Sequence, residues 1–142
     1  MTQRVLLYVE DDDAAFLVMQ LTLQEAQAQI ELHRAVDGEQ ALAFVRKKNP
    51  YADAPRPDLI LLDLSLPKRS GMEVLTELKS DESLRFIPVI MFSSSTRPVD
   101  EGRSLELGAQ EYVRKPFSLE GLVDTLKRAF PPPERAAERD GN

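Results

Sequence analysis

Five short apolar segments, separated by stretches with helical spacing, constrain the fold of this chain more than any other feature of its sequence. The segments are 5–9, 30–36, 59–62, 89–92 and 112–113. The first, third and fourth are nearly continuous and rich in Val, Ile and Leu, which is typical of strands buried on both faces of a parallel sheet. The second alternates between apolar and polar residues and is predicted to be an edge strand.

The stretches between these segments place apolar residues three and four positions apart, as on one face of a helix. The stripes are Phe16, Met19, Leu23 and Ala26; Ala41, Leu42 and Val45; Val74, Leu75 and Leu78; and Leu119, Leu122, Val123, Leu126 and Phe130. Strands that alternate with helices imply βαβ units with right-handed crossovers. We therefore predict an α/β fold, a flavodoxin-like doubly wound five-stranded parallel sheet of order 2-1-3-4-5 with five helices.

One domain accounts for most of the 142 residues, a length in the usual range for a single core. Residues 1–130 contain all the predicted elements and form the predicted domain. Residues 131–142 begin with three prolines and continue with charged residues, which predicts a flexible tail.

Charge and composition exclude several classes of function. The net charge of −6 argues against nucleic-acid binding, because phosphate backbones favour a basic surface. The chain has no cysteine, which excludes disulfides, zinc–thiolate sites and thiol nucleophiles. The first apolar run is too short for the core of a signal peptide, and no later stretch approaches a membrane span. We therefore expect a cytoplasmic protein that does not bind membranes.

Polar residues gather where the predicted strands end, the edge at which open α/β sheets bind their ligands. Four acids from Glu10 to Asp13 follow the first strand, Asp63 ends the third, Ser93 ends the fourth and Lys115 follows the fifth. Clustered carboxylates repel one another unless a cation lies among them, and oxygen ligands suit Mg²⁺. A carboxylate can also form an acyl phosphate, a reaction that needs a metal, a fixed cation and a hydroxyl around the phosphoryl group.

Four segments carry a resemblance to a known family. They are YVED at 8–11, LLDLSLP at 61–67, MFSS at 91–94 and YVRKPF at 112–117. In this order they resemble the receiver domains of two-component response regulators, over about residues 4 to 130. The segment PDLILLDL at 57–64, with the proline-containing loop before it, is most similar to stand-alone receivers that partner bacterial phytochromes.

The resemblance implies a role for each strand-end residue. Asp63 is the phosphoacceptor, which takes a phosphoryl group from a sensor histidine kinase, such as a bacterial phytochrome. Ser93 hydrogen-bonds the phosphoryl oxygen, Lys115 pairs with it, and Tyr112 is the aromatic residue that reorients when Ser93 moves. The ligands of the Mg²⁺ cofactor are Asp11, Asp63, the backbone carbonyl of Ser65 and, through water, Glu10.

The same resemblance implies a phosphoacceptor signalling protein that catalyses only its own phosphorylation and dephosphorylation. It would signal to an unknown downstream protein through a phosphorylation-sensitive surface.

We predict this surface on the fourth helix, fifth strand and fifth helix, because Ser93 and Lys115 lie at the starts of the elements that form it. Its mixed charge, including Arg114 and Lys127, and an apolar anchor at Phe130 predict a two-fold homodimer. The alternative is that the charges are merely solvated and Phe130 belongs to the core.

Three residues differ from those usual in receivers: Glu10 replaces Asp, Ser65 replaces Asn and Ser93 replaces Thr.

Other classes of protein also fit part of the pattern. A phosphatase of the haloacid dehalogenase type also uses an Asp nucleophile, but needs a second acid where this chain has Ser65. A flavodoxin-type FMN carrier binds phosphate after the first strand, where four acids would repel it. A degenerate receiver with only an interaction role would not need Asp63, Ser93 and Lys115.

Overall fold

The computed structural model describes residues 3–115 and 118–130. The predicted tail at 131–142 and the last two residues of the YVRKPF motif lie outside the described residues. The elements alternate along the chain as β1 (Arg4–Val9), α1 (Asp13–Glu25), β2 (Ile30–Ala35), α2 (Gly38–Val45), β3 (Leu59–Asp63), α3 (Gly71–Ser80), β4 (Val89–Ser93), α4 (Pro98–Glu106), β5 (Glu111–Arg114) and α5 (Leu119–Ala129).

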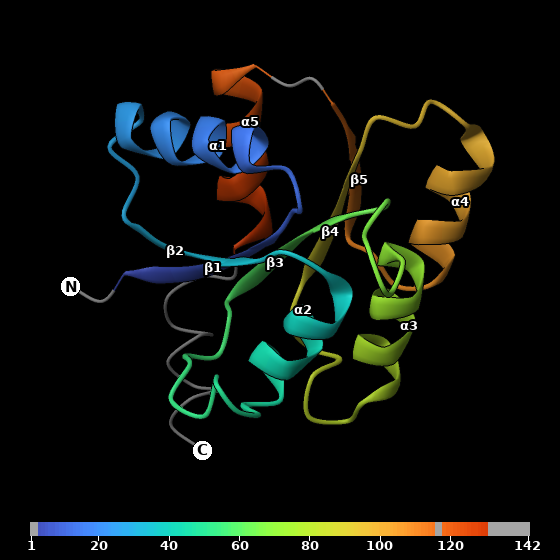
Figure 1. The fold of residues 1–142 in the computed structure, drawn as a ribbon. Helices are drawn as coiled ribbons and strands as arrows, with labels where there is room; N and C mark the ends of the chain where they lie inside the picture. Colours follow the sequence, from blue (N-terminus) through green and yellow to red (C-terminus); the bar gives the residue numbers. More distant parts are fainter. Residues whose placement is uncertain (1–2, 116–117, 131–142) are drawn as a thin grey trace.

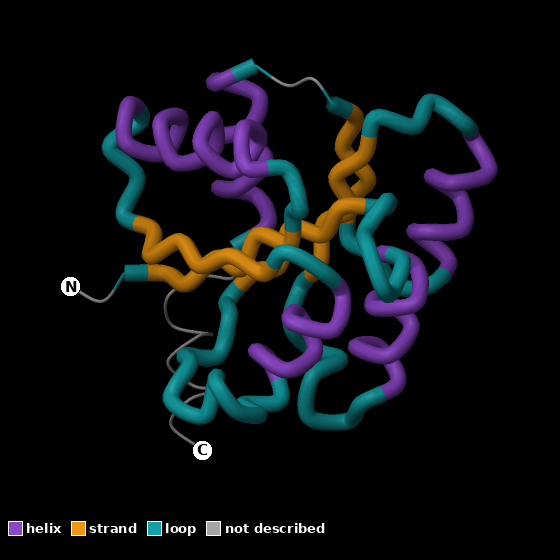
Figure 2. The backbone as a smooth tube through the Cα atoms, viewed as in Figure 1, coloured by secondary structure: helices purple, strands orange, loops and turns teal. Residues whose placement is uncertain are grey.

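The five strands form one parallel sheet of order β2-β1-β3-β4-β5, which confirms the predicted fold. Figure 1 shows α1 and α5 together on one face of the sheet and α2 and α3 on the other. The tube in Figure 2 shows the same layers, with the strands as a twisted central band between the helices. As predicted, β2 lies at an edge, and β5 forms the opposite edge.

The central strands are apolar throughout because the sheet has a core on each face. Along β1, Leu6 and Tyr8 pack in the core under α1 and α5, whereas Leu7 and Val9 pack in the core under α2 and α3. All four are at most 1% exposed. Since successive strand residues point to opposite faces, a strand covered on both sides must be apolar at every position.

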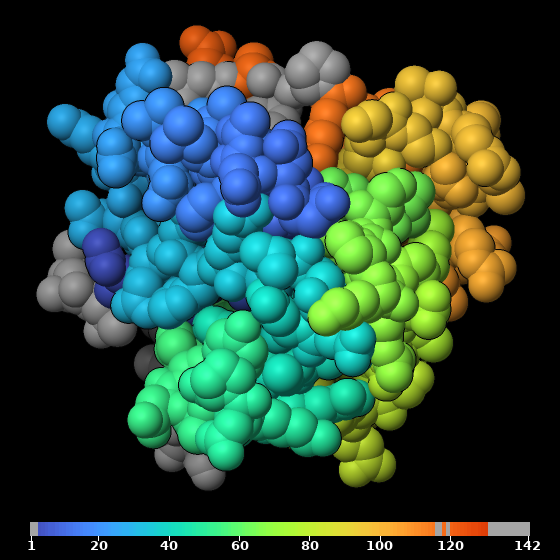
Figure 3. Space-filling model, in the orientation of Figure 1, coloured from blue at the N-terminus to red at the C-terminus, as the bar shows by residue number. Residues whose placement is uncertain are grey.

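Helix α4 is attached differently from the other helices. Of its nine residues, all of which the structure describes, only Ser104 is buried. The Ser104 hydroxyl lies 3.7 Å from the sulfur of Met72 on α3, while Val99 and Leu105 are exposed. Figure 3 shows α4, in gold, at the rim of the molecule beside the green atoms of α3.

Within the described residues, no helix combines the length and the apolar character needed to cross a membrane.

Candidate functional site

The strand-end residues converge, as predicted, on one cleft at the carboxyl edge of the sheet. The cleft has a volume of about 600 Å³. It is lined by Glu10, Asp11, Asp63, Ser65, Ser93, Ser94, Ser95 and Lys115. The parallel topology places these residues together because β1, β3, β4 and β5 all end at this edge.

Lys115 is the central charge of the cleft. Its Nζ lies 2.7 Å from Oε1 of Glu10 and 2.7 Å from Oδ2 of Asp63. The backbone places it there, because the Lys115 N–H donates to the carbonyl of Ser93 and extends the pairing of β5 with β4 by one residue. One ammonium therefore pairs with two carboxylates, one directly after β1 and one at the end of β3, and leaves the three groups with a net charge of −1.

Both carboxylates are almost fully buried, at 2% exposure for Glu10 and 7% for Asp63. Glu10 also accepts hydrogen bonds from the hydroxyl of Tyr8, at 3.0 Å, and from the N–H of Asp12, at 3.2 Å. Asp63 Oδ1 accepts the N–H of Ser65, at 2.9 Å. These bonds compensate for the burial of charge, which would otherwise destabilise the fold.

The pKa values of the two carboxyl groups are shifted in opposite directions. Burial, together with the neighbouring Glu10 charge, raises the pKa of Asp63 above its ordinary value, although the Lys115 ammonium and the N–H of Ser65 act to lower it. Burial also raises the pKa of Glu10, but Lys115 and the N–H of Asp12 more than offset it and leave that pKa below its ordinary value. Burial lowers the pKa of Lys115, yet its bonds to Asp63 and Glu10 raise it overall. Tyr8, which is buried beside the Glu10 charge, has its pKa raised far above 10.

The acidic residues form a set that fits a hard divalent cation. One carboxylate oxygen each from Glu10, Asp11 and Asp63 lies within 4.8 Å of the others. Oxygen ligands with space for water are what Mg²⁺ requires, and the open cleft provides that space. Asp11 is exposed and makes the set accessible from solvent.

Ser93 and Tyr112 are linked through one residue. The Ser93 hydroxyl is buried and accepts the N–H of Ser95 at 3.0 Å, while the Tyr112 hydroxyl donates to the carbonyl of Ser95 at 3.2 Å. The Ser95 hydroxyl donates to Asp100 of α4 at 2.6 Å. Ser95 therefore connects the predicted switch pair to α4. No pattern in the sequence distinguishes Ser95 from its neighbours in the run of serines at 93–95.

Of the predicted interface residues, Arg114 pairs within its own chain. Its guanidinium lies 3.3 Å from Glu101 on α4, and Lys127 is exposed on α5. Phe130 is only 6% exposed and packs in the core beneath α1 and α5. The prediction of an exposed apolar anchor at Phe130 was therefore wrong, because the end of α5 turns this ring toward the sheet. The alternative, a core residue, is correct.

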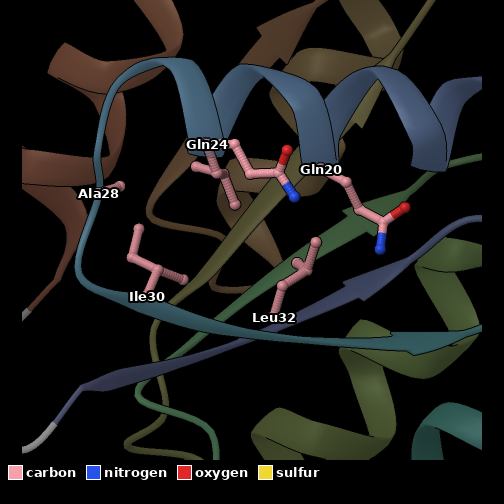
Figure 4. A pocket seen from close by; sticks show the side chains of 6 residues that line it. Gln20, Gln24, Ala28, Ile30 and Leu32 are labelled. Atoms are coloured by element: carbon pink, nitrogen blue, oxygen red, sulfur yellow. The ribbon is translucent and has the colours of Figure 1, made fainter.

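A second hollow lies between α1 and β2, away from the acidic edge. Figure 4 shows Gln20 and Gln24 of α1 above Ile30 and Leu32 of β2. The hollow between them has a volume of about 170 Å³. None of its six lining residues carries a charge. It therefore lacks groups for acid–base or metal chemistry.

This fold and this cleft define a class of signalling protein. Residues 6–127 match the family described as response regulator receiver domain, and the chain belongs to that family. The protein is thus a receiver-domain response regulator of two-component systems.

Its relatives give a narrower likeness. Response regulator Rcp1 of Synechocystis sp. is 40% identical over 124 residues, which cover 87% of this chain and 84% of Rcp1. The Mn²⁺-bound structure of Rcp1 superposes with a TM-score of 0.78 at 38% identity, covering 88% of this chain and 90% of that one.

Two further solved structures extend this likeness. The phosphorylated cyanobacterial phytochrome response regulator RcpA has a TM-score of 0.79 at 39% identity, with 89% and 90% of the two chains covered. The bacteriophytochrome response regulator AtBRR has a TM-score of 0.79 at 34% identity, with 89% and 92% covered. The resemblance to receivers associated with phytochromes is confirmed.

Proposed function

We propose that the protein is a phosphorylation switch in which Asp63 accepts a phosphoryl group in a Mg²⁺-dependent reaction. The observation that carries the proposal is the contact of Lys115 Nζ with Asp63, at 2.7 Å, inside a cleft that also holds Glu10 and Asp11. The donor is a sensor histidine kinase, and the names of the related regulators support a phytochrome in that role. The place of action is the cytoplasm, the compartment that supplies a kinase with ATP.

The chemistry follows from the residues of the cleft. A carboxylate oxygen of Asp63 attacks the phosphorus of a phosphohistidine, a P–O bond forms, and the P–N bond breaks. The leaving imidazole nitrogen keeps the electron pair and takes up a proton. The Lys115 ammonium, already beside Asp63, can then pair with the phosphoryl oxygens, and the Ser93 hydroxyl can donate to one of them.

Three groups of this chain would hold the metal directly: Asp11, Asp63 and the carbonyl of Ser65. Glu10 would act through water. When bound, Mg²⁺ supplies positive charge that stabilises the phosphoryl oxygens during transfer. The Mn²⁺-bound form of Rcp1 supports a divalent cation in a receiver of this kind.

The surface of α1 supports docking of the kinase. This helix begins beside Asp11 and exposes Leu17, Val18 and Leu21, each at 53%. Leu17 and Leu21 are four residues apart and lie on one face with Val18 next to them. A partner that brings a phosphohistidine to Asp63 can bury this apolar face, which is otherwise left in water.

For the output we retain the surface of α4, β5 and α5. The bonds from Ser95 to Ser93, Tyr112 and Asp100 support it, because a movement of the Ser93 hydroxyl changes the environment of a residue bonded to both β5 and α4. The proposed homodimer would use Arg114 and Lys127 without Phe130. Sedimentation with and without phosphorylation tests it, and a dimer unaffected by Arg114→Glu would contradict this surface.

Incubation with a small-molecule phosphodonor tests the central proposal. We expect an adduct of one phosphoryl group on Asp63, located by mass spectrometry, that decays slowly and does not form with EDTA or in Asp63→Asn. Rapid multiple turnover of the donor would instead indicate a phosphatase. No adduct on the folded, Mg²⁺-loaded protein would indicate an interaction module.

A further inference from the structure

Arg34, near the end of β2, contacts three parts of the segment that carries the acidic residues. Its Nε donates to the backbone carbonyl of Glu10 at 3.0 Å. Its Nη1 lies 2.9 Å from Oδ1 of Asp13, and the guanidinium lies over the ring of Phe16, 5.0 Å from the centroid. The Arg34 side chain is 20% exposed, although its partner Asp13 is 94% exposed. The guanidinium is therefore held by the turn after β1, through Glu10, and by the start of α1, through Asp13 and Phe16.

The contact with Glu10 replaces a missing backbone bond. The Glu10 N–H donates to the carbonyl of Ala35 at 2.9 Å, so Glu10 continues the pairing of β1 with β2. Strand β2 ends at Ala35, and α2 follows after its N-cap Asp37. No further strand residue remains to donate to the Glu10 carbonyl. Arg34 Nε supplies that donor, so both the N–H and the carbonyl of Glu10 are hydrogen-bonded.

We propose that Arg34 is a positioning residue that orients the metal-binding carboxylates of Glu10 and Asp11. It acts on the residue before Asp11 through the Glu10 carbonyl and on the turn after it through Asp13. The inference rests on the proposed function, since it concerns the same metal site. The buried Nη2 of Arg34 has no hydrogen-bond partner among the described residues. The contacts of Nε and Nη1 therefore determine the position of the guanidinium group.

A positioning role and a purely electrostatic role of Arg34 predict opposite effects of its removal on Mg²⁺ affinity. A cation beside four acids repels Mg²⁺, so if Arg34 acted only through its charge, removing it would strengthen Mg²⁺ binding. If Arg34 orients the ligands, removing it weakens binding, as loss of a group that holds metal ligands usually does. Arg34→Lys separates the two further, because lysine keeps the charge but cannot donate to Glu10 and Asp13 through a planar fork.

The experiment measures Mg²⁺ affinity by calorimetry for the wild type, Arg34→Lys, Arg34→Met and a control, Arg56→Lys. Arg56 also donates to a backbone carbonyl, that of Ser83 at 2.9 Å, but its partner lies in the connection before β4, at the opposite edge of the sheet. Backbone amide NMR spectra without metal report whether the turn from Glu10 to Asp13 has moved, and urea titrations report stability separately.

We expect both Arg34 variants to bind Mg²⁺ at least about tenfold more weakly, at low and high salt, with Arg56→Lys unchanged. The Glu10 and Asp11 amide signals should shift in Arg34→Lys. Equal affinity of Arg34→Lys and wild type, or tighter binding by Arg34→Met, would overturn the positioning role. If Arg34→Met does not fold, Arg34→Lys decides alone. A wild type that binds no Mg²⁺ would instead refute the proposed function.

Discussion

Gly71 offers the sharpest test of how the phosphoacceptor strand is packed. A Cβ at this position would lie 2.3 Å from the carbonyl oxygen of Asp63 and 2.9 Å from the Cα of Leu64. Both are backbone atoms, so no side-chain rotation relieves the clash, and the start of α3 must move away from β3. Overpacking of this kind costs about 1–3 kcal/mol, and we expect Gly71→Ala at the upper end. The movement also displaces the segment from Leu64 to Ser70, which includes Ser65.

Gly102, in the exposed middle of α4, provides the matched control. A Cβ there meets no atom within 4 Å. Alanine is favoured over glycine inside a helix, so Gly102→Ala should stabilise the protein by about 0.5–1 kcal/mol. Urea unfolding of both variants without Mg²⁺ measures the difference, and the phosphorylation rate should fall only in Gly71→Ala. A Gly71→Ala protein as stable and as reactive as the wild type would refute this account of the packing.

Three further substitutions address the charges and the docking face. Because burial raises the pKa of Asp63, the wild type loses stability as the pH rises through that raised value. Asp63→Asn should therefore be at least as stable as the wild type at pH 7 without metal. In urea titrations this gain should vanish below about pH 3.8, where Asp63 is protonated in both the folded and the unfolded wild type. Lys115→Met leaves the Glu10 and Asp63 charges unpaired, so the stability of the metal-free protein should fall by about 1–3 kcal/mol. Mg²⁺ should then stabilise this variant more than it stabilises the wild type, and equal stabilisation of both proteins would contradict this. Leu17→Asp should slow phosphotransfer from the kinase about tenfold but leave the rate of phosphorylation by a small phosphodonor unchanged. The control Val99→Asp should accept phosphate from the kinase at the wild-type rate.

The sequence predicts the sheet well because its strands carry a strong and simple signal. A two-sided core demands continuous apolar runs in β1, β3 and β4. The parallel order of these strands and β5 then brings Asp63, Ser93 and Lys115 into one cleft. Helix α4 has no such signal. Its buried residue is the polar Ser104, so no apolar stripe marks it, and only the alternation of the other elements predicts it.

The supporting contacts of the site could not be predicted because they depend on strand register. Tyr8 lies two residues before Glu10 and so shares its side of β1, a relation visible in the sequence, but the hydrogen bond requires both side chains to turn toward each other. Arg34 is adjacent to Tyr8 only through the pairing of β2 with β1. Phe130 continues the apolar stripe of α5, and this signal of core packing should have outweighed its reading as a surface anchor.

The sparse attachment of α4 has a consequence for how stability is distributed. With Ser104 as its only buried residue and no side-chain cap at Arg97, this helix loses little buried apolar area when it opens. Its amide protons should therefore exchange with solvent by local opening, at a free energy well below that of global unfolding, while those of β1 and β3 exchange only when the whole domain unfolds. Asp63 thus lies at the end of a strand that we expect to exchange only on global unfolding. Ser95, which is hydrogen-bonded to Ser93, contacts a helix that we expect to exchange by local opening.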